Sequence, residues 1–325
     1  MAATPPLTGA GPSTFLPPLP AMKTRNQATW IGLSAILLWA SVMGMIRRVS
    51  VDLGPLGGAA MVYTVAAALV MFTVGLPSLK HMPRRYLFWG SLLLVSYEVC
   101  LSQSIGYAHT SRQAIDVIMI NYLWPSFTMV AAILFNRQKI NWLIVPGLSM
   151  SLLCIGRVLG GKHGLDLAEV LTSIQDNPLS CGLALLAAIL WAAYSTVTAR
   201  MAEGQNGISL FFVLIAMVLW AKYLVSGAPA MHWTLPSVLH LAWAAAAIGF
   251  GYAAWNIGIM HGSVTILAGA SYFTPVFSAA LAAHLLGVPL TASFWLGTAM
   301  VSGGALLCWL ATRIQPVAKP PLQAA

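Results

Sequence analysis

The sequence predicts an all-α integral membrane protein with ten transmembrane helices, arranged as two inverted five-helix repeats around a central cavity. Three observations predict this fold: the composition is very apolar, ten apolar segments have membrane-spanning length, and the two halves of the chain are similar. Of the 325 residues, 59% are hydrophobic and only 7% are charged, whereas soluble domains carry about 25% charged residues. This composition excludes a soluble enzyme, a disordered chain and a nucleic-acid-binding protein.

Ten apolar segments, separated by Gly, Pro or charged residues, approach the ~20 residues that a helix needs to cross a bilayer. They cover approximately residues 27–46, 57–76, 85–107, 113–135, 141–159, 179–201, 208–227, 237–259, 264–286 and 290–312. Their apolar runs are continuous rather than alternating, which favours helices over a barrel. Helices also satisfy their own backbone polar groups inside the membrane.

The regions outside these spans define the expected domain organisation. Residues 1–22 and 314–325 are rich in Pro and Ala and are expected to be disordered tails. Between the tails, the chain divides into a first five-helix repeat at 23–160, an extracytoplasmic connector at 161–177 and a second five-helix repeat at 178–313.

The Lys and Arg residues predict the orientation in the membrane. With the N-terminus in the cytoplasm, ten of the 16 basic residues lie inside and six lie outside, in agreement with the positive-inside rule. Arg47 and Arg48 fall outside and oppose this bias locally. We therefore expect an inner-membrane protein with both termini in the cytoplasm.

The cysteines and histidines give no sign of a metal site or cofactor. Four cysteines, which are Cys100, Cys154, Cys181 and Cys308, lie inside apolar segments and form no C-x-x-C pair. This pattern argues against a disulfide frame or a zinc site and favours small core residues. We expect no cofactor.

The two halves of the chain resemble each other at an offset of about 150 residues. Leu38-Trp39-Ala40 recurs as Leu190-Trp191-Ala192, and Tyr122-Leu123-Trp124-Pro125 recurs as Tyr272-Phe273-Thr274-Pro275. Because each repeat holds five spans, an odd number, the second copy must enter the membrane from the opposite side. Inverted repeats are typical of transporters, in which two halves move about a site near the midplane.

Polar and aromatic residues inside the spans mark the expected site, because buried polar groups need partners or a water-filled cavity. The candidate substrate-binding residues are Trp39, Tyr97, Glu98, Ser102, Asn121, Tyr122, Trp124, Pro125, Tyr194, Tyr252, Trp255, Asn256, Ser271, Tyr272 and Pro275. Aromatic walls suit a flat ligand through stacking or a cation through its attraction to the ring face, and simple packing is the alternative. Pro125 and Pro275 each free a carbonyl one turn earlier, which either binds an ammonium group or accompanies a packing kink.

Glu98 is the only acidic residue near the centre of a predicted span. A carboxylate at that depth is costly, so a functional role is the default interpretation. Glu98 either binds a substrate amine, exchanges a proton or forms a structural hydrogen bond with a neighbouring Ser or Tyr. Asp116 lies near a span end, four residues after Arg112, where a local ion pair explains it.

These residues together resemble a known family. The chain resembles the drug/metabolite transporter superfamily, with its two EamA-type repeats, and within it the YddG-type aromatic amino acid exporters of Gram-negative bacteria. The matching segments include Asn121-Tyr122-Leu123-Trp124-Pro125, Tyr252-Ala253-Ala254-Trp255-Asn256 and Ser271-Tyr272-Phe273-Thr274-Pro275. The resemblance covers about residues 23–315 and implies an inner-membrane exporter of Phe, Tyr and Trp.

One departure from the superfamily pattern limits what the resemblance implies. Many members carry a Glu directly after the spans that correspond to 113–135 and 264–286. This chain reads Phe135-Asn136-Arg137 and Leu286-Gly287-Val288 there. A mechanism that depends on those acids does not carry over.

The sequence therefore predicts a secondary transporter that exports aromatic amino acids by alternating access, as a uniporter or coupled to an ion gradient. No G-x-x-x-x-G-K-S/T segment for ATP is present. The alternative is a broad-specificity exporter of aromatic cations, which the same aromatic residues and Glu98 would serve. An intramembrane enzyme is disfavoured because the spans hold no catalytic cluster. The expected partners are a small-molecule substrate and the lipid bilayer, without nucleic acid, and the protein is expected to be a monomer.

Overall fold

The computed structural model describes residues 25–76, 79–80, 82–136, 141–159, 166–203, 205, 207–261 and 264–313. Within these residues the regular structure is helical. The helices are α1 (Arg25–Leu53), α2 (Pro55–Val74), α3 (Arg84–Gly106), α4 (Ser111–Asn121), α5 (Trp124–Asn136), α6 (Ile144–Leu159), α7 (Leu167–Asp176), α8 (Pro178–Met201), α9 (Ile208–Val225), α10 (Leu235–His261), α11 (Val264–Ser271), α12 (Thr274–Leu286) and α13 (Ala292–Arg313). The predicted tails 1–22 and 314–325 lie outside the described residues.

Eight of the predicted spans correspond to single helices, but the spans 113–135 and 264–286 are each broken in two. The first break, between α4 and α5, falls two residues before Pro125. The second, between α11 and α12, falls at the equivalent place before Pro275. Proline lacks the N–H that would continue the helix and restricts the residue before it. The prediction of two continuous spans was therefore wrong.

The predicted connector contains an additional helix, α7. Asp166 caps its N-terminus by accepting hydrogen bonds from the N–H groups of Ala168 at 2.9 Å and Glu169 at 3.3 Å. Leu167 and Leu171 are exposed, and no residue of α7 is buried. This short helix therefore lies on the surface of the molecule.

The exterior of the helices is apolar. Trp30, Phe72 and Val225 are 72%, 78% and 89% exposed, while the core is rich in small residues such as alanine. Seven helical stretches of the described residues are long and apolar enough to cross a membrane, which are Asn26–Leu53, Pro55–Val74, Ser111–Phe135, Pro178–Thr198, Ile208–Val225, Leu235–Trp255 and Ala292–Ala311. The chain is therefore a multi-pass membrane protein.

The remaining apolar helices fall outside this set for physical reasons. The stretches Ile144–Leu159 and Thr274–Leu286 are apolar but shorter. Helix α3 has 23 residues, but Glu98, Gln103 and several serines lower its hydropathy. These polar residues are buried inside the protein, where they do not meet lipid.

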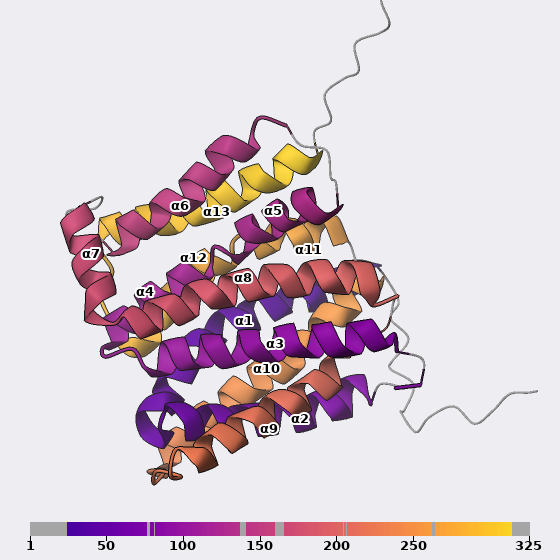
Figure 1. Ribbon diagram of the computed structural model, residues 1–325, viewed down its shortest axis with the longest axis vertical. Helices are drawn as coiled ribbons and strands as arrows, with labels where there is room; N and C mark the ends of the chain where they lie inside the picture. The colour runs from indigo at the N-terminus through magenta and orange to yellow at the C-terminus, as the bar shows by residue number, and fades with distance from the viewer. Residues whose placement is uncertain are drawn as a thin grey trace, which may run out of the picture.

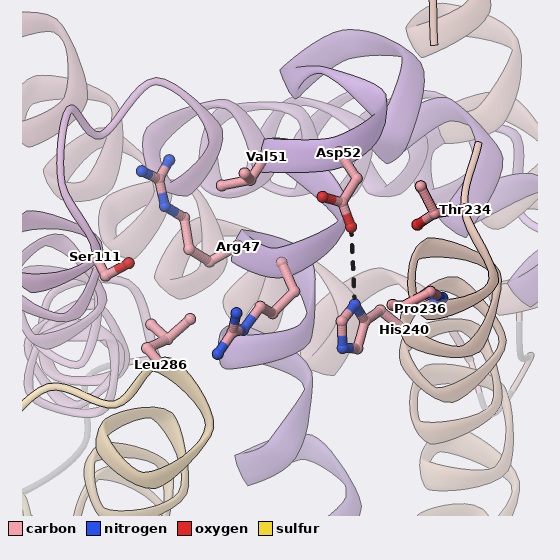
Figure 2. Close-up of a pocket in the computed structure, with 9 residues that line it drawn as sticks. Arg47, Val51, Asp52, Ser111, Thr234, Pro236, His240 and Leu286 are labelled. Carbon is pink, nitrogen blue, oxygen red and sulfur yellow. Dashed lines mark ion pairs between the residues drawn. The ribbon is translucent and has the colours of Figure 1, made fainter. Parts of the chain in front are cut away.

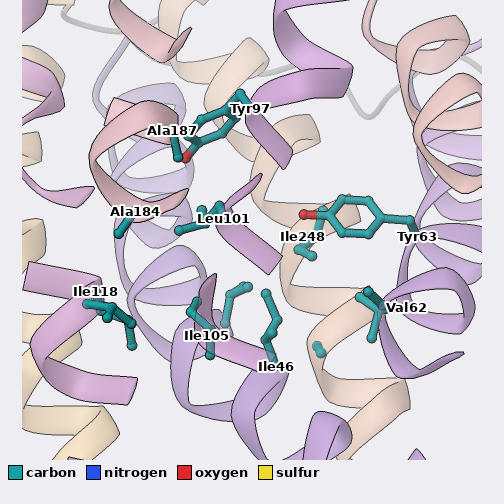
Figure 3. Close-up of a cluster of buried hydrophobic side chains, with 14 of the residues drawn as sticks. Ile46, Val62, Tyr63, Tyr97, Leu101, Ile105, Ile118, Ala184, Ala187 and Ile248 are labelled. Carbon is teal, nitrogen blue, oxygen red and sulfur yellow. The ribbon is translucent and has the colours of Figure 1, made fainter. Parts of the chain in front are cut away.

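The most extensive helix contacts join the first half of the chain, α1–α6, to the second half, α8–α13. Helix α1 packs on α10, α3 on α8, α2 on α9 and α6 on α13. Figure 1 shows α6 and α13 side by side at one end of the molecule and α2 with α9 at the other. The apolar core between them includes Tyr63, Tyr97 and Ala187, and Figure 3 shows Tyr97 beside Ala187.

Helices α6 and α13 approach closely where two glycines face each other. A Cβ atom added at Gly304 would lie 2.6 Å from the carbonyl oxygen of Gly147, which is too close for any other residue. Cys154 and Cys308 are fully buried at the same helix pair, and all four cysteines are free thiols. Small side chains therefore allow this helix pair to pack tightly.

Candidate functional site

Aromatic rings from four helices form a first aromatic cluster, made of Trp39, Tyr252, Trp255, Phe212 and Tyr63. Trp39 of α1 lies at its centre, with its ring centroid 5.2 Å from Tyr252 and 5.3 Å from Trp255, both on α10. Tyr252 continues to Phe212 of α9 at 5.1 Å, and Phe212 to Tyr63 of α2 at 5.9 Å. The indole nitrogen of Trp39 is buried without a hydrogen-bond partner.

A second aromatic cluster surrounds Trp191 of α8. Its ring centroid lies 4.8 Å from Tyr97 of α3, 5.6 Å from Trp124 of α5 and 5.7 Å from Tyr194. Phe211 of α9 lies 6.5 Å beyond Tyr194. Trp39 and Trp191 occupy equivalent places in the sequence repeat, so each cluster is built around one member of that pair.

Glu98 connects the two clusters. It follows Tyr97 on α3, is 6% exposed, and accepts a hydrogen bond of 2.5 Å from the Tyr63 hydroxyl. Its carboxyl group also interacts electrostatically with Tyr252 and Tyr194. Within the described residues, no basic side chain pairs with Glu98. Because an unpaired buried charge is costly, the carboxyl group must either carry a proton or meet a cationic ligand.

The break between α4 and α5 brings polar atoms to the second cluster. Asn121 is 1% exposed, and its side chain interacts with Tyr97. Its amide oxygen has no hydrogen-bond partner, and Pro125 offers no N–H to the Asn121 backbone carbonyl. These oxygens can accept hydrogen bonds from an ammonium group. Pro275 and Ser271 repeat this backbone arrangement at the second break.

The other predicted site residues lie in different surroundings. The Ser102 hydroxyl donates to the Val99 carbonyl at 3.2 Å within its own helix. Tyr272 pairs with Trp309 of α13, at a centroid distance of 6.1 Å, and Tyr122 is buried at the first break. Asn256 lies in α10, but its side chain falls outside the described part of the structure.

The sequence prediction missed Tyr63 and Phe212. Tyr63 had a detectable signal, because a tyrosine in the middle of an apolar span needs a partner for its hydroxyl. Phe212 carried no comparable signal among the many apolar residues of its span. The predicted local ion pair between Arg112 and Asp116 is confirmed at 3.1 Å.

Comparisons with known proteins agree with a transport function for this architecture. The model of the EamA-like transporter family matches residues 179–310. A protein of Salmonella typhimurium named aromatic amino acid exporter YddG is 56% identical over 290 residues, covering 89% of this chain and 99% of that protein. The protein of that name in Escherichia coli is 55% identical over the same coverage.

More distant similarities extend along the same length of chain. The protein with the same name in Ancylobacter novellus is 24% identical over 298 residues, with 89% and 99% coverage. A protein of known crystal structure matches with a TM-score of 0.60 at 20% identity, covering 89% of this chain and 99% of the other. That last similarity concerns the fold alone.

Proposed function

Because this chain belongs to the family of the YddG exporters, within the EamA-like transporters, we propose that it exports aromatic amino acids across the bacterial inner membrane by alternating access. It is a transporter and not an enzyme. The observation that carries the choice of substrate is the meeting of two aromatic clusters at the Glu98–Tyr63 hydrogen bond. Two ring-lined walls beside a buried carboxyl group match a ligand that carries an aromatic ring and an ammonium group.

In this proposal the substrate ring lies among the two clusters, where offset or edge-to-face contacts are favourable. The ammonium group binds the unpartnered Asn121 amide oxygen and the carbonyls that Pro125 and Pro275 leave free. Trp39, through its unpartnered indole N–H, is a donor for the carboxylate. The other predicted site residues keep their proposed role as lining of the central path.

We further propose that the helices form ten spans in two inverted repeats, with α4–α5 and α11–α12 as the broken spans. The helix contacts support this arrangement, because α1 packs on α10 and α12 while its repeat counterpart α8 packs on α3 and α5. Helices α2 and α9, and helices α6 and α13, pair with their own counterparts. Both termini then lie in the cytoplasm, and α7 lies at the outer surface.

Coupling to a proton gradient would act through Glu98, the buried carboxyl group between the clusters. If transport is uniport, Glu98 meets the substrate ammonium only transiently. An exporter of aromatic cations would use the same rings and carboxyl group, so it remains the second candidate. The high identity to relatives named for aromatic amino acids favours the first candidate.

Flux of labelled Phe from liposomes that contain the purified protein tests the proposal without any imposed ion gradient. We expect saturable efflux that excess Trp and Tyr block and excess Lys does not. Trp39→Ala should abolish most of this flux, while Trp30→Ala, which changes an exposed tryptophan of the same helix, should retain it. Block by a quaternary aromatic cation, without block by Trp or Tyr, would support the second candidate instead. Flux only under a pH gradient would establish obligatory proton coupling.

A further inference from the structure

The arginine pair that opposes the positive-inside rule lines a cavity. This cavity of about 340 Å³ lies between the ends of α1, α4, α10 and α12, and its lining includes Arg47, Arg48, Asp52 and His240. Its volume is within the usual range for small-ligand sites. Figure 2 shows Arg47 toward one side of the cavity and the Asp52–His240 ion pair at the other.

Both arginines keep unused hydrogen-bonding capacity. Arg47 is 8% exposed and donates to the Gly106 carbonyl at 3.3 Å, while its Nε has no partner. Arg48 donates to the Leu285 carbonyl, at 3.1 Å from its Nε. These bonds cap the C-terminal ends of α3 and α12, which favours a positive charge there. A guanidinium group has five donors, so capping leaves donors available in the cavity.

The opposite wall of the cavity carries a negative group. The Asp52 carboxylate lies 3.9 Å from Nδ1 of His240, and this nitrogen has no hydrogen-bond partner. A small cavity thus offers guanidinium donors on one side and a carboxylate on the other. This charge pattern is complementary to a zwitterion.

The cavity lies at the end of the helix pair that carries the first aromatic cluster. On α1, Arg47 follows Trp39 by eight residues, or about 12 Å along the axis. On α10, His240 precedes Tyr252 by twelve residues, or about 18 Å. Between these levels the Trp243 indole donates to the Ser41 hydroxyl at 2.9 Å, which holds α1 and α10 together.

We propose that this cavity is an exit subsite that binds the head group of an α-amino acid, with the carboxylate on Arg47 and Arg48 and the ammonium group on Asp52. The proposal deepens the proposed function, on which it rests, by giving the substrate a second position along the path. Arginine binds carboxylates in a charge-assisted, often bidentate geometry. The subsite therefore selects amino acids over aromatic amines, which the aromatic clusters alone do not.

Protection of Arg48 from phenylglyoxal tests this subsite directly. Arg48 is exposed, and Arg200 at the end of α8 is an exposed arginine far along the chain that serves as the internal control. The purified full-length protein is labelled in phosphatidylcholine nanodiscs, and modification is followed by mass spectrometry. We expect Phe and 3-phenylpropionate, which carry a carboxylate, to slow modification of Arg48 at least fivefold, and phenylethylamine, which lacks one, to have no effect. Equal protection by phenylethylamine, or protection of Arg200 to the same extent, would overturn the proposal.

Two further arms distinguish binding in this cavity from binding at the central aromatic clusters and from binding of a lipid headgroup. In Trp39→Ala, which removes the centre of the first cluster, Phe should still protect Arg48; loss of protection there would assign the effect to the central site and overturn the subsite. In nanodiscs with phosphatidylglycerol, Phe should still protect Arg48. Protection by the anionic lipid alone, with no further effect of Phe, would instead identify a lipid headgroup site.

Transport by arginine variants completes the test. Arg47→Gln should lower the ratio of Phe flux to phenylethylamine flux about tenfold, and Arg47→Lys should restore most of it because the positive charge is kept. An unchanged ratio in Arg47→Gln, measured on protein with wild-type thermal stability, would overturn the proposal. Failure of wild-type Phe flux together with intact protection of Arg48 would reject the proposed transport function and leave the subsite standing.

Discussion

Tyr63 of α2 donates a hydrogen bond to Glu98 of α3 across a distance of 2.5 Å, and both side chains are almost completely buried. Tyr63 belongs to the first aromatic cluster, and Glu98 adjoins the second through Tyr97. The bond therefore holds a carboxyl group at the junction of the two ring-lined walls. This junction and the helix packing around it can both be tested by substitution.

Removal of the Tyr63 hydroxyl should destabilise the protein. Tyr63→Phe leaves a buried carboxyl group without its hydrogen-bond donor, which costs about 1–3 kcal/mol. We expect a lower midpoint of thermal unfolding in detergent. The double variant Tyr63→Phe with Glu98→Gln should recover part of this loss, since a neutral amide is cheaper to bury. Equal unfolding midpoints for wild type and Tyr63→Phe would contradict the prediction.

Replacement of Glu98 should remove the pH dependence of transport. Glutamine has the same shape but cannot exchange a proton, so export by Glu98→Gln should be constant across the pH range in which wild-type export changes. The measurement is Phe efflux from liposomes buffered equally on both sides. A pH profile that is the same in both proteins would show that another group titrates. Asp116→Asn, which changes the carboxylate of a local ion pair, is the matched control.

The central tryptophan of the second cluster should matter as much as that of the first. Trp191 contacts three rings of the second cluster, so Trp191→Ala removes several ring contacts worth about 0.5–1.5 kcal/mol each. We expect kcat/KM for Phe efflux to fall at least tenfold. Trp142→Ala is the control, because Trp142 is exposed on the exterior. Similar losses in both variants would indicate a general effect of tryptophan removal.

A methyl group at the glycine contact of α6 and α13 should destabilise the fold. In Gly304→Ala the new Cβ would lie 2.6 Å from the Gly147 carbonyl oxygen, so the helices must separate, at a cost of about 1–3 kcal/mol. Gly182→Ala provides the comparison, because a Cβ at Gly182 of α8 meets no atom within 4 Å. We expect a lower unfolding midpoint for the first variant only. An unaltered midpoint in Gly304→Ala would mean that this helix pair separates without cost.

Much of the fold was predictable from the sequence because apolar length alone marks a membrane helix. The same criterion hid the two helix breaks, since Tyr122 and Tyr272 interrupt the hydrogen bonding without interrupting the apolar run. Helix α7 was missed because its ten residues are too few for a span and lie in a polar connector. Propensity for such a short helix depends on its cap, Asp166.

The candidate site was predictable where its residues are unusual and hidden where they are ordinary. Glu98 is conspicuous in any apolar span, and the paired Trp39 and Trp191 appear in the repeat. Tyr63 acquires its importance from a residue on another helix, which no local pattern reports. The cavity beside Arg47 requires four helix ends to meet, so its arginines carried only an orientation signal in the sequence.

The pairing of α1 with α10 has a consequence for the synthesis of the chain. The two helices start about 210 residues apart, so at typical translation rates roughly 10–40 s separate their emergence from the ribosome. During that interval α1 is already in the bilayer while the partner that covers most of its surface does not yet exist. The same delay applies to α6, which waits for α13, the last helix to be made. Neither half of the protein can mature alone, and assembly is complete only when the final helix has been inserted.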